Sequence, residues 1–181
     1  MTLPDDDAAL VERCLAGDSR AQRALVERHR PAIWRLARNA TGVPEEAFDI
    51  AQETFVAAFL ALPRYDVSRP FGAWLRRIAL NKCHDWSRRR AVRRLFSFGM
   101  PEGFEALLPD DAALPDRVAG ARAEFARVSR AIAELPVRLK EVLLLRAVDG
   151  MSQADTAALL GISEKAVETR LARARRILSN D

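Results

Sequence analysis

The stretch from Gly161 to Leu178 carries side chains whose chemistry suits a polyanion. It reads GISEKAVETRLARARRIL, with arginines and small residues placed between apolar residues at helical spacing. Guanidinium groups bond phosphates and guanine edges, and small side chains let a helix backbone approach a DNA groove. The stretch therefore predicts a helix that lies against DNA, with an ordinary solvated face as the alternative.

Dividing this helix by face separates a packing side from a contact side. Steps of four, three and four residues place four apolar side chains inward together: Val167, Leu171, Ala174 and Leu178. On the other side, Arg173 is expected to reach base edges or phosphate, and Arg170 and Arg175 suit the phosphate walls. Glu168 is expected to accept from a cytosine amine or to point away from the phosphates. The candidate contacts with duplex DNA are Ser163, Lys165, Glu168, Thr169, Arg170, Ala172, Arg173 and Arg176.

The residues before this helix predict a second, shorter helix and a tight turn. Ser152 is placed to cap the short helix, with Asp155 three residues later as its partner. Gly161 is expected to end that helix and Ser163 to cap the next one. Two helices joined by a glycine turn are typical of a helix-turn-helix, which favours the DNA-binding interpretation.

Helical periodicity dominates the rest of the chain, which has 181 residues and a net charge of +4. We expect helices over 6–16 and 19–38, the second kinked or divided at Pro31. A third helix is expected between Pro44 and Pro63, and a fourth runs from about Pro70 through the arginine cluster. Glycine, proline and acidic residues then predict a linker, and helical patterns resume at 118. The expected fold is all-α with two small helical domains.

The third expected helix carries a polar stripe. Asp49, Gln52 and Glu53 follow one another at steps of three and one, on one side of the helix. The apolar contacts of this helix are expected from Phe55, Val56, Phe59 and Leu60. Taken alone, such a stripe is more often a solvated face than a binding site.

Two segments in this order and spacing resemble a known family. EEAFDIAQETFVAAFLALPRYD followed by RPFGAWLRRIALNKCHDWSRRR resembles the second conserved domain of bacterial sigma factors, in the extracytoplasmic-function group of the sigma-70 family. LPVRLKEVLLLRAVDGMSQADTAALLGISEKAVETRLARARRIL resembles the fourth domain. The resemblance implies domain 2 over 5–95, a linker over 96–117 that threads through the polymerase, and domain 4 over 118–181.

The resemblance also implies roles for residues of the N-terminal half. Asp49, Gln52 and Glu53 would dock on the clamp helices of core polymerase. A pocket formed by 64–69 and Asn81 would hold bases of the melted minus-ten element, with Tyr65 stacking and the Asn81 amide pairing with a base edge. Trp74 is expected in the core, whereas Trp86 suits either core packing or stacking. The full set of minus-ten candidates is Tyr65, Arg76, Arg77, Asn81, Lys82, Asp85, Arg88, Arg89 and Arg90.

The implied function is promoter-specific transcription initiation by a factor that binds core RNA polymerase and promoter DNA under the control of an anti-sigma factor. Domain 4 would read the duplex near minus thirty-five. Two alternatives stay open: a helix-turn-helix regulator that acts without core polymerase, and an interaction adaptor that mimics a sigma factor. The absence of a leader pattern and of a long apolar run predicts a cytoplasmic protein without membrane insertion.

Residues that suggest catalysis or metal binding are few. Cys83 and His84 are neighbours in sequence, but adjacent helical side chains point about 100° apart and cannot act as a nucleophile and base. Cys14 and Cys83 are too few for a disulfide framework or a closed zinc site. We therefore expect no enzyme activity, no cofactor and no metal. Thr156 stands where the family usually has an aliphatic residue, which is expected to loosen packing under the turn.

Overall fold

The N-terminal half folds as a bundle of helices in a computed structural model, of which we describe residues 6–96 and 127–179. The described residues contain no strand. The expected linker and the start of the helix expected from 118 lie outside the described residues. The bundle consists of α1 (Asp7–Leu15), α2 (Ser19–Thr41), α3 (Pro44–Ala61), the short 3-10 helix η1 (Leu62–Arg64) and α4 (Phe71–Phe96).

Local sequence signals set the ends of these helices. Asp6 caps α1 by accepting a hydrogen bond from the amide of Ala9 at 2.8 Å. Gly42, with φ of 73°, ends α2 in the left-handed conformation, and Pro44 starts α3. The expectation that Pro31 could divide α2 is wrong, because Pro31 lies inside one helix that ends at Thr41.

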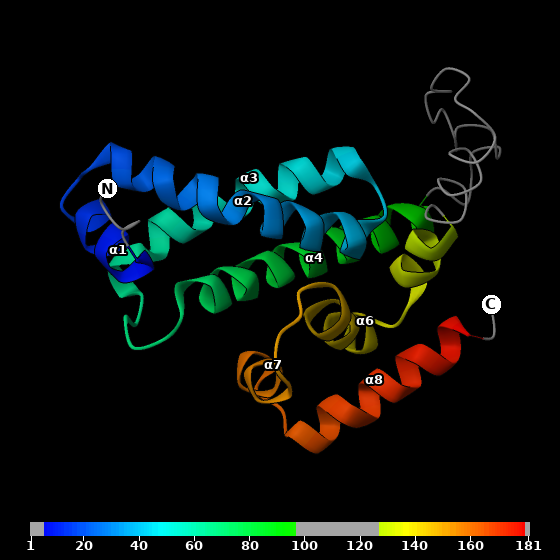
Figure 1. Cartoon of the computed structure of the whole chain (residues 1–181). Helices are drawn as coiled ribbons and strands as arrows, with labels where there is room; N and C mark the ends of the chain where they lie inside the picture. Colours follow the sequence, from blue (N-terminus) through cyan, green and yellow to red (C-terminus); the bar gives the residue numbers. More distant parts are fainter. Residues whose placement is uncertain (1–5, 97–126, 180–181) are drawn as a thin grey trace, which may run out of the picture.

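The core of the bundle forms where α2, α3 and α4 face one another (Figure 1). Leu25 and Leu36 of α2 and Leu75 of α4 are fully buried. Ala47 and Ala58 of α3 are buried as well, and their small size lets the helix backbones approach closely. The core therefore follows the apolar stripe of each helix.

The C-terminal half contains α6 (Val137–Leu143), the π-helical turn η2 (Leu144–Val148), α7 (Gln153–Leu160) and α8 (Glu164–Leu178). Residues 127–134 form a further helical segment before α6. Pro136 caps α6 instead of being its first residue. Ser152 caps α7, Gly161 ends it with φ of 66°, and Ser163 caps α8. The expected helix-turn-helix is confirmed in these details.

The two halves pack against each other. Figure 1 shows α6 and α7 beneath α4, with α8 as the outermost helix on that side. Leu144 and Leu145 of η2 are fully buried in the same apolar cluster as the N-terminal bundle. Within the described residues, no helix is long and apolar enough to cross a membrane.

Candidate nucleic-acid interface

The outward face of α8 forms a shallow groove of about 460 Å³. Val167 and Ala174 on the opposite face are fully buried, and α8 packs on α6. The groove is lined by Lys165, Glu168, Thr169, Ala172, Arg173 and Arg176. These are six of the eight residues expected to contact duplex DNA, and the structure brings them together on one exposed surface.

Some polar and charged side chains at this groove already have partners within α8. Lys165 Nζ lies 2.9 Å from Glu168 Oε2, so the carboxylate already has a cationic neighbour. Ser163 Oγ accepts the amide of Ala166 at 3.1 Å and is therefore first of all a helix cap. Within the described residues, no carboxylate forms an ion pair with Arg173. Its guanidinium keeps its donors available for an acceptor outside the chain.

The polar stripe on α3 also lines a groove, of about 440 Å³. Asp49, Gln52 and Glu53 lie in it as expected, all exposed. Val56 and Leu60 lie beside them with 61% and 80% of their surfaces exposed. The expectation that these two residues supply internal contacts is wrong, because they point to the same side as the polar stripe.

Glu53 and Lys82 connect this groove to α4. Lys82 Nζ lies 3.2 Å from Glu53 Oε2, and both side chains are partly exposed. Lys82 was expected to contact DNA and Glu53 to contact polymerase. The structure therefore places members of the two expected sets within one ion pair.

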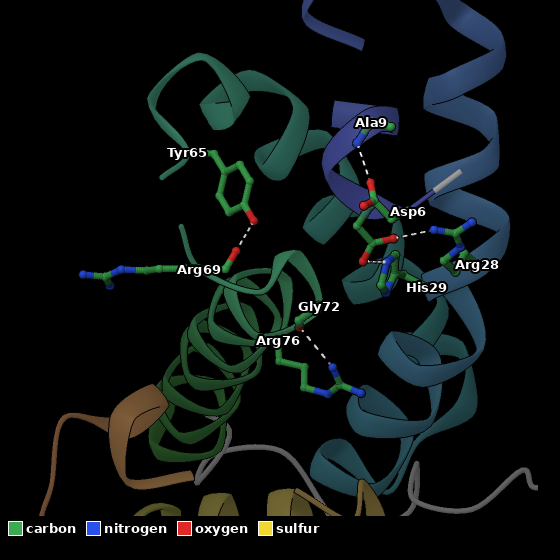
Figure 2. Close-up of polar contacts among 9 residues, drawn as sticks. Asp6, Ala9, Arg28, His29, Tyr65, Arg69, Gly72 and Arg76 are labelled. Carbon is green, nitrogen blue, oxygen red and sulfur yellow. Dashed lines mark hydrogen bonds and ion pairs between the residues drawn. The ribbon is translucent and has the colours of Figure 1, made fainter. Parts of the chain in front are cut away.

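Tyr65 lies in the loop that enters α4, where Figure 2 shows its hydroxyl directed at the backbone of Arg69. The hydroxyl donates to the carbonyl oxygen of Arg69. The ring centroid lies 4.8 Å from that of Trp74 and 5.6 Å from that of Phe71. Burial raises the pKa of Tyr65, as do the charges of Asp7 and Asp66. Tyr65 is thus half-buried in an aromatic cluster with Trp74. Trp74, expected in the core, is partly buried and packs against it.

The same end of the bundle is fastened by Asp7. Asp7 Oδ1 accepts from Arg28 at 2.8 Å, and Asp7 Oδ2 lies 2.9 Å from His29 Nε2. Burial alone would raise the pKa of Asp7, but the hydrogen bonds and charges of Arg28 and His29 outweigh it and lower the pKa. Figure 2 shows Arg28 and His29 on α2 facing the start of α1. These contacts hold the start of α1 against α2.

The second half of α4 carries the remaining candidates for contact with the minus-ten element. Asn81 and Arg89 are exposed, and Arg88 forms an ion pair with Asp85. The hydrogen bond from Arg88 lowers the pKa of Asp85. Arg90 lies over the ring of Trp86, with 5.2 Å between the guanidinium carbon and the ring centroid. Trp86 is 6% exposed, so it packs in the core.

Arg76 and Arg77 both contact the C-terminal half, although Arg77 is also exposed to solvent. Arg76 Nε donates to Asp149 Oδ2 at 2.7 Å, and the side chain of Asp149 is fully buried. The other end of the Arg76 guanidinium donates to the carbonyl of Gly72 at 3.1 Å (Figure 2). Arg77 donates to the carbonyl of Leu159 at 3.1 Å. Both arginine side chains thus donate hydrogen bonds to the C-terminal half.

Comparison with known proteins gives a family match for each half of the chain. Residues 25–93 match the family described as Sigma-70 region 2, and residues 125–178 match Sigma-70, region 4. The RNA polymerase sigma factor NccH of Alcaligenes xylosoxydans xylosoxydans is 43% identical over 97% of this chain and 94% of its own length. The ECF RNA polymerase sigma factor SigD of Mycobacterium bovis is 35% identical over 96% of this chain and 82% of its own.

A solved structure agrees with both matches. CnrH in complex with the cytosolic domain of CnrY is similar with a TM-score of 0.73 and 38% identity, over 97% of this chain and 96% of that one. The chain belongs to the extracytoplasmic-function group of sigma-70 family RNA polymerase sigma factors. The fold expected from the sequence and the implied activity in transcription initiation are thereby confirmed.

In this sigma factor, the contacts between regions 2 and 4 involve residues that sequence reasoning missed. Asp149 accepts from Arg76, and Glu141 Oε1 lies 2.9 Å from His84 Nε2, at ion-pair distance without hydrogen-bond geometry. Lys140 Nζ donates to the carbonyl of Ala40 at 3.2 Å. No local pattern marks these residues, because their partners lie far away in the sequence.

The cysteine at this junction is unreactive. Cys83 is 4% exposed, and burial raises its pKa to about 12. A thiol with so high a pKa holds very little nucleophilic thiolate near neutral pH. Cys83 is thus a buried side chain of the core. Within the described residues, no group of three or more His, Cys, Asp or Glu side chains is placed to hold a metal ion.

Proposed function

We propose that region 4 reads the minus-thirty-five duplex through the groove on α8. The observation that carries this proposal is the gathering of six expected contact residues on one exposed helix face, after a capped helix and a glycine turn. Arg173 reaches a guanine edge or a phosphate, and Glu168 accepts from a cytosine amine beside Lys165. Ser163 and Arg170 contact phosphates at the sides of the groove.

We infer that region 2 binds the melted minus-ten element with the exposed side of α4. Asn81 is exposed and offers an amide to a flipped base, and Tyr65 in the loop that enters α4 offers an aromatic ring for stacking. Because Arg76 pairs with the buried Asp149 of region 4, it reaches phosphates only after the two regions separate. The phosphate contacts are Arg76, Arg77, Lys82, Arg88, Arg89 and Arg90, and Asp85 affects the choice of base.

The groove on α3 is our candidate for docking on core polymerase. Asp49, Gln52 and Glu53 supply polar and charged contacts, which mainly set specificity and association rate. Val56 and Leu60 add apolar area that is exposed in the free chain, as expected for a surface that another protein covers. We further propose domain boundaries of 5–95 for region 2, 96–117 for the linker and 118–181 for region 4.

Control by a protein partner completes the proposal. The relative CnrH was solved with the cytosolic domain of CnrY bound. We infer that this chain is likewise held inactive by an anti-sigma factor. It acts in the cytoplasm, by binding and without catalysis.

Reconstituted transcription tests the proposed function. The purified chain is added to sigma-free bacterial core polymerase with fragmented genomic DNA, and transcript starts are mapped. We expect discrete starts that share two upstream motifs. Binding to core without starts would favour the adaptor that mimics a sigma factor. Specific DNA binding without binding to core would favour the free-standing regulator.

A further inference from the structure

The outer face of α2 is basic along its length and takes no part in the proposed contacts with DNA or polymerase. The helix contains six arginines and a single acid, Glu27. Arg28 bonds to Asp7, but within the described residues no carboxylate forms an ion pair with the other five arginines. In Figure 1, α2 lies above α4, whereas α8 lies lowest in the view. The five arginines without a carboxylate partner are Arg20, Arg23, Arg30, Arg35 and Arg38.

Helical spacing gathers these arginines on one side of α2, together with Trp34. Steps of three, seven, four and four residues lead from Arg20 through Arg23, Arg30 and Trp34 to Arg38, and Arg35 follows Trp34 directly. Four of the five arginines are exposed, and Arg38 is partly buried. Leu25 and Leu36 on the opposite side of the helix are fully buried. At 1.5 Å per residue, the basic face is about 27 Å long.

This charge pattern works against the stability of α2 itself. Arg20 and Arg23 are three residues apart, as are Arg35 and Arg38, and like charges at this spacing repel each other. Arg20 also lies in the first turn, where the helix dipole disfavours a cation. Glu27 relieves none of this repulsion by an ion pair, as far as the described residues show. Helix formation therefore does not account for the basic face, whereas neutralisation by a bound polyanion does.

Trp34 adds an aromatic ring to the middle of the basic face. It is 39% exposed, and among the large apolar side chains of α2, all of which the structure describes, it alone is exposed. The guanidinium carbon of Arg38 lies 6.0 Å from the centroid of the ring, within the range of a cation–π contact. An exposed aromatic ring between arginines is the combination that binds single strands, because bases stack on the ring and phosphates bond to the guanidinium groups.

We propose that the outer face of α2 binds single-stranded nucleic acid, with one base stacked on Trp34 and phosphates on the arginines on either side of it. An acidic protein segment offers negative charges as well, but this face exposes no aliphatic side chain that such a segment could cover. Duplex DNA also offers phosphates, but its bases are stacked on one another and leave the ring of Trp34 without a partner. This surface is separate from the candidate contacts on α4 and α8.

The indole N–H signal of Trp34 in the 15N-labelled full chain provides the test. The chain has three tryptophans, and Trp34→Phe identifies this signal by its loss. The probes are twelve-nucleotide oligothymidylate and oligouridylate, whose relative affinities distinguish DNA from RNA as the source of the strand. We expect the single strand to move the signal upfield, because the ring current of a stacked base shields the group above it. A duplex of the same length should bind at this position roughly tenfold more weakly, since none of its bases is free to stack.

Charge variants measure the phosphate contacts. For single strands, each phosphate contact adds about 0.7 to the slope of log affinity against log salt concentration. Arg30→Gln with Arg35→Gln should therefore lower the slope of the Trp34 titration by about 1.4. Arg130→Gln with Arg138→Gln removes the same charge from exposed positions outside α2 and should leave the slope unchanged. Trp34→Leu should weaken binding roughly tenfold, measured at the backbone amide of position 34, because the stacking ring is lost.

Three results would overturn the proposal: an unmoved Trp34 signal, equal binding of the duplex at this position, or equal changes of slope in both arginine pairs. A twelve-residue polyglutamate peptide that moves the Trp34 signal as strongly as the single strand would also overturn it, because the face would then bind acidic protein segments. Every readout lies on α2 and involves neither polymerase nor a promoter, so failure here and failure of the proposed function are distinguishable.

Discussion

At the scale of single residues, Arg173 is our candidate for reading the minus-thirty-five duplex. We expect Arg173→Ala to weaken binding to the minus-thirty-five duplex by about 1–3 kcal/mol, because one bidentate base contact is lost. Binding is measured by fluorescence anisotropy at fixed salt. Arg175→Ala is the control for a flanking phosphate contact, which should lower affinity similarly for all sequences. A uniform loss with Arg173→Ala would assign that residue to phosphate instead.

Asn81 is expected to act after the duplex is bound. Asn81→Ala should leave the closed promoter complex unchanged and reduce opening roughly tenfold, because the freed base loses its amide partner. Permanganate reactivity of the minus-ten thymines measures opening, and a mobility shift at low temperature measures the closed complex. Equal losses in both assays would contradict a role in melting.

Thr156 carries a defect in the core of region 4. Its side chain is fully buried, and its Oγ1 has no hydrogen-bond partner among the residues that the structure describes. Thr156→Val should therefore raise the free energy of unfolding by roughly 1 kcal/mol, measured in urea. The matched control is Thr54→Val, since Thr54 is equally buried but donates to the carbonyl of Ile50 at 2.7 Å. The control should not stabilise, and equal effects of both changes would contradict the explanation.

At the scale of elements, the turn between α7 and α8 depends on one glycine. Gly161 has φ of 66°, and no atom lies within 4 Å of the position of an added Cβ. Gly161→Ala should lower the free energy of unfolding by about 1–2 kcal/mol through backbone strain alone. Gly161→Asn should lower it less, because asparagine tolerates the left-handed conformation. Thermal unfolding measures both, and an unchanged midpoint for the alanine variant would contradict this reason.

Sequence reasoning succeeded where an element is specified locally. Ser152 and Ser163 each cap a helix by accepting an amide three residues later. Gly161 ends α7 through its own left-handed backbone conformation. It failed at Pro31, where burial of Leu25, Ile33 and Leu36 on both sides outweighs about 3 kcal/mol for a proline in a helix.

It was right for Phe55 and Phe59 of α3, which pack in the core, but failed for Val56 and Leu60. Helical periodicity shows which residues share a face but not which molecule covers that face. Val56 and Leu60 were therefore assigned to the interior although they are exposed. That the six expected residues of α8 share one face could be predicted because one helix carries them all.

At the scale of the whole molecule, the packing of regions 2 and 4 could not be predicted. Arg76 and Asp149 are 73 residues apart, and neither position carries a local signal. The same holds for Lys140, whose acceptor on Ala40 lies 100 residues away. Such contacts depend on how whole helices dock on one another, which cannot be deduced from any short stretch of the sequence.

Arg76 and Asp149 form an ion pair between regions 2 and 4. Removing one partner of a buried ion pair costs about 3–5 kcal/mol, because the other charge is left without compensation. Asp149→Asn should therefore loosen region 4 from region 2. We expect a larger radius of gyration by X-ray scattering and faster hydrogen exchange at Leu144 and Leu145, which the contact buries.

An apolar replacement separates the charge from the shape of this contact. Arg76→Met with Asp149→Leu removes both charges and should restore the compact radius, since apolar residues of similar volume often replace a buried pair without loss. An unchanged radius in Asp149→Asn would mean that apolar burial of Leu144 and Leu145 suffices to hold the regions together. Expansion in both variants would mean that the ion pair itself is required, which desolvation of two buried charges argues against.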